Sequence, residues 1–184
     1  MKTPLVLLLL VGLIISVANA TRPLQKTPGN SSLEYYNGGG GARCRNNSEC
    51  TAFMNMQNSA RAEVGEEPFA WDHKVESYAR WWAEQRREDC QLLHSDGPYG
   101  ENIFWGSGSD WTPVDAVQDW LEEKEYYNYE SNSCESGEMC GHYTQIVWNN
   151  TQVIGCARVV CYSGDVFMTC NYHPPGNYIG ERPY

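Results

Sequence analysis

The stretch from Val153 to Tyr172, VIGCARVVCYSGDVFMTCNY, contains two runs of residues with high strand propensity. Only a short polar connection, Tyr162 to Gly164, separates them, and such a spacing is typical of an antiparallel β-hairpin. A third run with strand character, ENIFWG, starts at Glu101. The sequence therefore predicts a small antiparallel sheet whose strands come mainly from the second half of the chain.

Residues 51–65 and 71–90 show the periodicity of amphipathic helices. Asp72 is a suitable N-cap for the second of them. The apolar positions recur every three or four residues, at Phe53, Met56, Ala60 and Val64 in the first segment and at Val75, Tyr78, Ala79 and Trp82 in the second. Two helices are therefore expected ahead of the sheet.

A third helix is predicted within residues 111–127, where Thr112 can act as N-cap and Pro113 suits the first helical position. Its predicted buried face consists of Val114, Val117, Trp120 and Leu121. Because the helices come first and most strands come later, the order favours an α+β domain with an antiparallel sheet over a doubly wound fold.

The N-terminal residues have the features of a secretory signal peptide in positions 1–20, with Lys2, an apolar core and a small-x-small cleavage site that ends at Ala20. Residues 21–50 lack apolar periodicity and include four consecutive glycines, so they predict a flexible arm before a compact domain at 51–184. No later segment has the roughly 20 apolar residues of a membrane span. We therefore expect a secreted, extracellular protein without a transmembrane anchor.

All eight cysteines lie beyond the signal peptide, at positions 44, 50, 90, 134, 140, 156, 161 and 170. An even number in a secreted chain predicts a disulfide framework, whose pairing the spacing leaves open. Cys44 and Cys50 enclose a loop short enough for a local clip. Three sequons, at Asn30, Asn46 and Asn149, predict glycosylation. The net charge of −10 argues against nucleic acid as a partner.

Four polar residues are candidates for one site: His94, Glu101, Glu123 and His142. Two histidines with two carboxylates form a familiar ligand set for zinc, but a lone histidine or glutamate is more often structural or solvated. The separations along the chain leave open whether the four meet. Helical geometry places Glu122 on a solvated face and Glu123 at the edge of the apolar stripe. No zinc-protease helix, nucleophile elbow or phosphate-binding loop is present in the sequence.

Three motifs, CGHYTQIVW (140–148), GCARVVC (155–161) and CNYHPPGNYIG (170–180), together resemble the CAP superfamily of cysteine-rich secretory proteins, antigen-five allergens and pathogenesis-related proteins of the first class. PYGENIFWGSG, DAVQDW and the terminal ERPY resemble its plant pathogenesis-related branch. The resemblance covers about Thr51 to Tyr184. It implies a three-layer α-β-α sandwich that encloses a small antiparallel sheet and is stabilised by disulfides.

The resemblance also implies a cleft tetrad at the same two histidines and two glutamates, which in some relatives holds a divalent metal such as zinc. It implies no enzymatic activity and no required cofactor. The implied disulfides are Cys90–Cys161, Cys134–Cys140 and Cys156–Cys170, which leaves Cys44 to pair with Cys50. In one departure from the family pattern, Gln57 stands where a histidine is usual, so local repacking is expected in the first helix.

Three functions follow as hypotheses. The leading one is a monomeric defence protein of the apoplast that binds a sterol or lipid, with an aromatic patch formed by Trp120, Tyr126, Tyr127 and Tyr129, although these residues also fit an ordinary core and rim. The second is a precursor whose accessible C-terminal segment, Pro174 to Tyr184, is released as a signalling peptide for a receptor. The third, an alternative, is a metal-dependent hydrolase that uses the tetrad.

Overall fold

The computed structural model describes residues 48–184. The signal peptide, the glycine-rich arm, Cys44 and the sequons at Asn30 and Asn46 lie outside these residues, and so does the expected pairing of Cys44 with Cys50. The three predicted helices are present as α1 (Ser48–Glu63), α2 (His73–Arg86) and α3 (Pro113–Glu122). The three predicted strands are present as β2 (Gly100–Gly106), β5 (Val153–Val160) and β6 (Val166–His173).

The local start signals of the helices act as predicted. The Asp72 carboxylate accepts hydrogen bonds from the backbone N–H groups of Lys74 and Val75 at the start of α2. Thr112 and Asp115 form a reciprocal capping box at the start of α3, and Pro113 is the first helical residue. Val114 is an exception to the predicted buried face, because this first-turn residue is 38% exposed.

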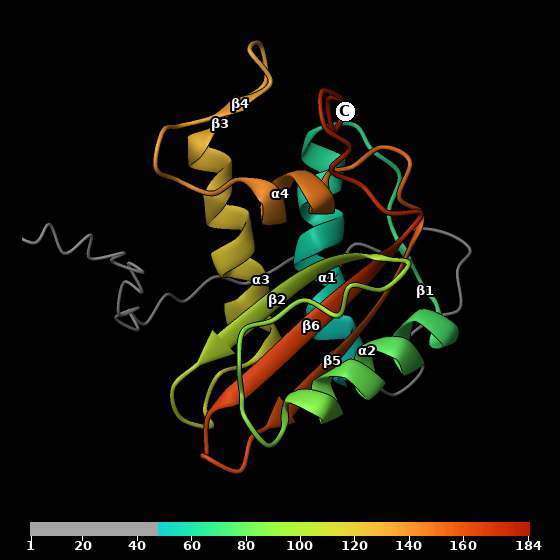
Figure 1. The fold of residues 1–184 in the computed structure, drawn as a ribbon. Coiled ribbons are helices and arrows are strands. Elements are labelled where there is room, and N and C mark those ends of the chain that lie inside the picture. The colour runs from blue at the N-terminus through green and yellow to red at the C-terminus, as the bar shows by residue number, and fades with distance from the viewer. Residues whose placement is uncertain (1–47) are drawn as a thin grey trace, which may run out of the picture. The chain divides into compact units, whose positions relative to one another are not determined.

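The main sheet has the strand order β1-β5-β6-β2 (Figure 1). β5 and β6 form the predicted antiparallel hairpin, and β2 pairs antiparallel with β6 at one edge. At the other edge, β1 (Ala70–Trp71) pairs with β5 in parallel, so the sheet is mixed rather than purely antiparallel. A strand of two residues is too short to show any periodicity, and its pairing depends on β5.

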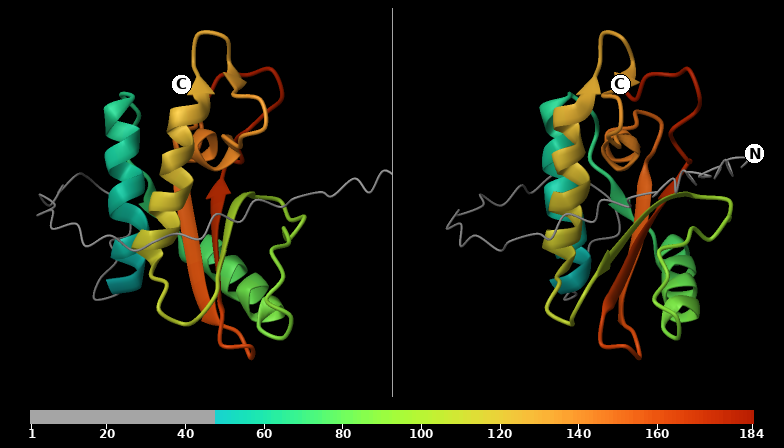
Figure 2. Two further views of the ribbon diagram at one scale, coloured as in Figure 1. Left: turned by 90° about the vertical axis from the view of Figure 1, so that its left-hand side faces the viewer. Right: turned by 60° about the vertical axis from the view of Figure 1, so that its left-hand side comes forward.

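Helices cover both faces of the sheet, as the expected three-layer sandwich requires (Figure 2). α2 packs on one face, where Gly155 allows close approach, since a Cβ there would lie 2.0 Å from the backbone nitrogen of Glu76. Alternate residues of β5, such as Ile154 and Cys156, join the larger core on the side of α1 and α3. Ala157 and Val159 belong to the smaller core beneath α2.

Several short elements were absent from the sequence prediction. They are α4 (Gly141–Ile146), the 3-10 turn η1 (Glu123–Tyr126) and the two-residue strands β3 (Tyr127–Asn128) and β4 (Ser133–Cys134). They occupy the connection between α3 and β5, on the side of the sheet opposite α2 (Figure 1). Segments this short carry little intrinsic stability, so tertiary contacts determine their conformation.

Three disulfides join the pairs that the family resemblance implied: Cys90–Cys161, Cys134–Cys140 and Cys156–Cys170. Cys156 and Cys170 are opposite each other in the β5–β6 register. Cys134–Cys140 closes the short loop between β4 and α4. These bonds therefore fix both the central hairpin and the irregular connection that leads into α4.

Two buried polar side chains of α1 hold neighbouring segments in place. The Arg61 guanidinium donates to the carbonyl oxygens of Ile146, Trp148 and Thr151, which fixes the segment after α4, and burial lowers its pKa to about 10. Gln57 is fully buried, donates to the Phe53 carbonyl and accepts a hydrogen bond from the Tyr172 hydroxyl at 2.8 Å. A glutamine at position 57 is thus accommodated within the core hydrogen-bond network.

Candidate functional site

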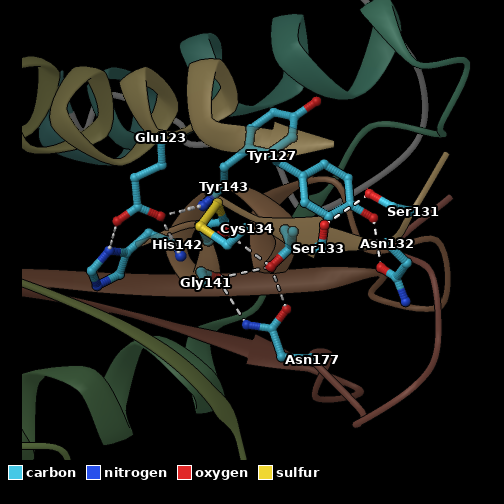
Figure 3. Close-up of a disulfide and its surroundings, with 12 residues drawn as sticks. Glu123, Tyr127, Ser131, Asn132, Ser133, Cys134, Gly141, His142, Tyr143 and Asn177 are labelled. Atoms are coloured by element: carbon cyan, nitrogen blue, oxygen red, sulfur yellow. Dashed lines mark hydrogen bonds and ion pairs between the residues drawn. A yellow bond between two sulfur atoms is a disulfide. The ribbon is translucent and has the colours of Figure 1, made fainter. Parts of the chain in front are cut away.

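Glu123 and His142 form a close pair between the end of α3 and the start of α4 (Figure 3). The Nδ1 atom of His142 lies 2.6 Å from Oε1 of Glu123. The second carboxylate oxygen, Oε2, accepts the backbone N–H groups of His142 at 2.8 Å and Tyr143 at 3.2 Å. Glu123 thereby binds the otherwise unpartnered N–H groups of the first turn of α4.

The surroundings of this pair hold the imidazole in one orientation. The Trp120 ring stacks on the His142 ring, with centroids 6.0 Å apart and an interplanar angle of 25°. The Asn102 side chain of β2 donates to the His142 carbonyl oxygen at 3.0 Å. Glu123 is buried and Glu122 is exposed, as the helical phase predicted, although Glu123 already belongs to the 3-10 turn after α3.

His94 and Glu101 form the second pair, between the loop after α2 and the start of β2. Nδ1 of His94 lies 2.9 Å from Oε1 of Glu101. The carboxylate also accepts the backbone N–H and the hydroxyl of Ser95, and the Asn171 amide of β6 at 3.0 Å. His94 and Glu101 line a pocket of about 210 Å³ that includes neither residue of the first pair.

The second pair favours its charged form. The hydrogen bond to Glu101 raises the pKa of His94, against an opposing effect of burial. Burial by itself would raise the pKa of Glu101, but hydrogen bonds from His94, Ser95 and Asn171 outweigh it and hold that pKa below its ordinary value. Near the first pair, burial raises the pKa of Asp119.

The two pairs approach β2 from different sides. The Glu101 side chain bonds to Asn171 on one face of the sheet, whereas the next residue, Asn102, bonds to His142 on the other. Within residues 48–184, no three or more histidine, cysteine, aspartate or glutamate side chains are arranged to hold a metal ion. The donor types suit zinc, and in each pair the histidine contacts its glutamate through Nδ1, while the glutamates also accept hydrogen bonds from N–H and O–H donors.

The expected aromatic patch differs from the arrangement in the structure. Trp120 is fully buried, as its place on the predicted buried face of the helix implied, and its indole N–H donates to the Ile103 carbonyl oxygen at 3.1 Å, so it cannot belong to an exposed patch. Tyr126 and Tyr127 are half-buried. Tyr129 is 37% exposed, and its ring stacks on Tyr184 with centroids 4.7 Å apart.

The C-terminal segment, residues 174–184, is anchored at both ends and is not a loose tail. Near its start, the Pro174 carbonyl accepts from the Thr151 hydroxyl at 2.9 Å. Near its end, the Pro183 carbonyl accepts from the backbone N–H of Asn149 at 2.6 Å, and Pro183 is buried. Residues 177–182 between these anchors are exposed, so the expected accessibility holds only for the middle of the segment.

The structure also bears on the expected glycosylation at Asn149 and on the expected lack of a membrane span. The Asn149 side chain is exposed, which leaves this sequon accessible for a glycan. Among the helices of residues 48–184, none combines the length and the apolar character needed to cross a membrane.

Several residues that support the two pairs were missed at the sequence level. Asn171 and Asn102 reach the pairs from neighbouring strands, and no local pattern marks an asparagine in a strand as a partner of a distant glutamate or histidine. Ser95 follows His94 directly, but adjacency in the chain did not show that its hydroxyl would bind Glu101.

The model of the cysteine-rich secretory protein family, CAP, matches residues 54–172. The chain is 62% identical to "Pathogenesis-related protein PR-1" of Medicago truncatula over 133 residues, which are 72% of this chain and 77% of that protein.

Two solved structures share the fold. The crystal structure of NaASP2 with Zn²⁺ is 28% identical, with a TM-score of 0.61, and the match covers 79% of this chain and 90% of that one. Na-ASP-1 gives a TM-score of 0.65 at 24% identity, over 85% of this chain and only 46% of that longer one, so its likeness concerns the fold alone.

Proposed function

The chain belongs to the cysteine-rich secretory protein family, and on this basis we propose that it is a plant defence protein that is secreted into the apoplast and acts by binding rather than by catalysis. The observation that carries the proposal is the 62% identity to a plant pathogenesis-related protein over 77% of that protein's length. The disulfides support it, because such bonds persist in oxidising extracellular compartments.

Expression of the full chain in leaves tests the location. Immunoblots of extracellular wash fluid and of the remaining cell extract should show the protein mainly in the wash fluid. A variant that lacks residues 1–20 is the matched control and should stay in the cell extract. Retention of the full chain inside the cells would contradict secretion.

A sterol or lipid is the ligand class that we propose. The half-buried rings of Tyr126 and Tyr127, just after α3, offer apolar surface with polar hydroxyl groups, a combination that suits an amphipathic ring system. Trp120 takes no part in this proposal, because it is enclosed in the core. The proposed contact surface is therefore smaller than the patch expected from the sequence.

Retention of a radiolabelled sterol by purified protein tests this ligand. The double variant Tyr126→Ala, Tyr127→Ala should lose most of the binding, whereas Tyr162→Ala should bind as wild type, since Tyr162 is 78% exposed at the distant β5–β6 turn. Equal retention by all three proteins would reject the tyrosine surface. Absence of retention by wild type would reject the ligand class.

Release of residues 174–184 as a signalling peptide is a second candidate function. Exposure of residues 177–182 favours recognition of this segment by another protein. The junction at His173–Pro174 is held, however, because the backbone N–H of Gln152 donates to the His173 carbonyl at 3.0 Å. Release would therefore require local opening at the end of β6.

Mass spectrometry of extracellular fluid from stressed tissue tests for the fragment that begins at Pro174. Its appearance together with a shortened protein that ends at His173 would support processing. Recovery of only intact protein under the same conditions would count against it. No observation within residues 48–184 favours the metal-dependent hydrolase over binding, since both glutamates of the His–Glu pairs are engaged in hydrogen bonds.

A further inference from the structure

A separate groove lies beyond the two His–Glu pairs, between the β3–β4 loop, the start of α4 and the C-terminal segment. Its volume is about 330 Å³. Asn132 contributes from the loop, Ser133 from β4, Thr144 from α4 and Asn177 from the C-terminal segment. Figure 3 labels Asn132, Ser133 and Asn177. None of the four residues of the His–Glu pairs lines it.

The groove carries negative charge without a compensating base. Glu138 and Glu181 both line it, and neither carboxylate forms a hydrogen bond or ion pair with another residue in the described part of the chain. No lysine, arginine or histidine is among its lining residues. Arg182 follows Glu181, but its guanidinium donates to the carbonyl oxygens of Tyr129 and Glu130. A cationic ligand would therefore meet unpaired carboxylates.

Side-chain amides add groups that can bind hydroxyls. Asn177 donates to the Gly141 carbonyl and accepts from Thr144, and Asn132 donates to the Glu181 carbonyl and accepts from Tyr127. Each amide nitrogen carries two N–H groups, so each asparagine keeps one free donor in these arrangements. The groove thus offers neutral donors beside its negative charge.

Aromatic rings complete the lining. Trp148 lines the groove and is almost fully buried, whereas Tyr178, which also lines it, is 53% exposed. Their ring centroids are 6.1 Å apart, at an interplanar angle of 57°. An exposed tyrosine ring can cover the apolar face of a sugar or attract a nearby ammonium group.

We propose that this groove binds a cationic sugar of the amino-sugar class, with ammonium groups beside Glu138 and Glu181, hydroxyls at Asn132 and Asn177, and a ring face against Tyr178. The ligand differs in charge and polarity from a sterol, but Tyr127 also lines this groove, so the two proposed ligand surfaces adjoin at that residue.

The C-terminal segment is one wall of this site. Gly176 packs directly on Trp148, and a Cβ at position 176 would lie 2.6 Å from Cγ of Trp148 and 2.8 Å from Nε2 of Gln145. The backbone N–H of Gly176 also donates to Oε1 of Gln145 at 3.0 Å. A bound ligand should therefore favour the packed position of the segment, and displacement of the segment should weaken binding of the ligand. Because the two equilibria are coupled, each changes the other by the same factor.

Titration of the mature protein with a glucosamine tetramer, followed by NMR or calorimetry, tests the proposal. The fully N-acetylated tetramer is the matched ligand without charge. The glucosamine tetramer should bind several-fold more tightly than its acetylated counterpart, and about 0.5 M salt should remove most of the difference. Equal affinity for the two tetramers, or no binding of either, would overturn the proposal.

Variants of the protein localise the site. Glu138→Gln and Glu181→Gln should each weaken binding about threefold, as expected for exposed charge pairs. Glu130→Gln is the matched control, since Glu130 is exposed but does not line the groove. Unchanged affinity in both groove variants, or an equal loss in the control, would overturn the assignment.

Gly176→Ala tests the wall formed by the C-terminal segment, because the added methyl group displaces the segment from Trp148. Binding should fall at least tenfold, about the change produced by the loss of one or two hydrogen bonds. Thermal unfolding and the NMR spectrum of the sheet residues should show that the domain remains folded. Wild-type affinity in this variant would overturn the role of the segment.

Discussion

The two His–Glu pairs have the same chemical composition but different surroundings. The Glu123 and His142 side chains are 11% and 20% exposed, whereas those of Glu101 and His94 are 6% and 55% exposed. Both carboxylates are thus largely covered, whereas the His94 side chain is much more exposed than that of His142. Glu123 binds backbone N–H groups at the start of α4, while Glu101 binds mainly side chains of a surface loop and a neighbouring strand.

This difference indicates that a covered carboxylate contributes to the stability of the fold through the hydrogen-bond donors whose bonds it accepts. A carboxylate can be removed from water only if hydrogen bonds replace its hydration. Glu123 supplies acceptors to donors that have no other partner, since Tyr143 and its surroundings are buried. The donors around Glu101 include His94 and Ser95, which lie near solvent and can bind water instead. The two pairs should therefore respond unequally to the same substitution.

The largest effect is expected for Glu123→Ala. Loss of this carboxylate leaves the backbone N–H groups of His142 and Tyr143 without an acceptor, which should lower the free energy of unfolding by about 3 kcal/mol. Urea denaturation measures the change. Glu122→Ala removes the same charge from an exposed neighbour and should change stability by less than about 0.5 kcal/mol. Equal losses would show that charge, and not the acceptor role, matters.

A smaller effect is expected for Glu101→Ala. Water can replace the carboxylate at His94 and Ser95, so the expected loss of unfolding free energy is about 1–2 kcal/mol, mostly from the Asn171 amide. The same urea titration provides the value. A loss as large as that of Glu123→Ala would refute the proposed difference between the two pairs.

The pH dependence of stability should identify the more exposed pair. The raised pKa of His94 gives a contribution that is complete below its ordinary value of 6.5 and is lost as the pH rises through the raised value. The lowered pKa of Glu101 gives a contribution that is present above its ordinary value of 4.5 and is lost as the pH falls through the lowered value. The pair should therefore stabilise the protein most between about pH 4.5 and 6.5.

Thermal unfolding of wild type and His94→Gln from about pH 4.5 to 8 measures that contribution. The difference between them should stay below about 1 kcal/mol, because the histidine ring is exposed, and should shrink above neutral pH. A difference that grows steadily from pH 6 to 8 would have the wrong sign for this pair.

The smallest effect is expected for zinc. Because the two pairs approach β2 from different sides and no group of three ligands forms within residues 48–184, low micromolar zinc should produce no saturable stabilisation. Calorimetric titration of metal-free protein tests this. Saturable binding that is lost in both His94→Ala and His142→Ala would show that the pairs come together around an ion.

Local signals in the sequence were sufficient for much of the fold. The caps at Asp72 and Thr112 and the hairpin around Tyr162 to Gly164 depend on residues that are close in the chain, so their patterns could be recognised without tertiary information. The helical phase likewise distinguished buried Glu123 from exposed Glu122. The disulfide pairs, in contrast, came from family resemblance, since the spacing permitted many connectivities.

The sequence by itself determined the main helices and strands, the acidic character and the residue types of both His–Glu pairs. Only the tertiary structure decided that the Trp120 ring stacks on His142, that Glu123 organises the start of α4, and that the C-terminal segment forms a wall of a groove. Secondary structure follows from interactions within a few residues, whereas these features depend on hydrogen bonds and packing between distant segments. Such contacts form only when the sheet and its covering helices bring those segments together.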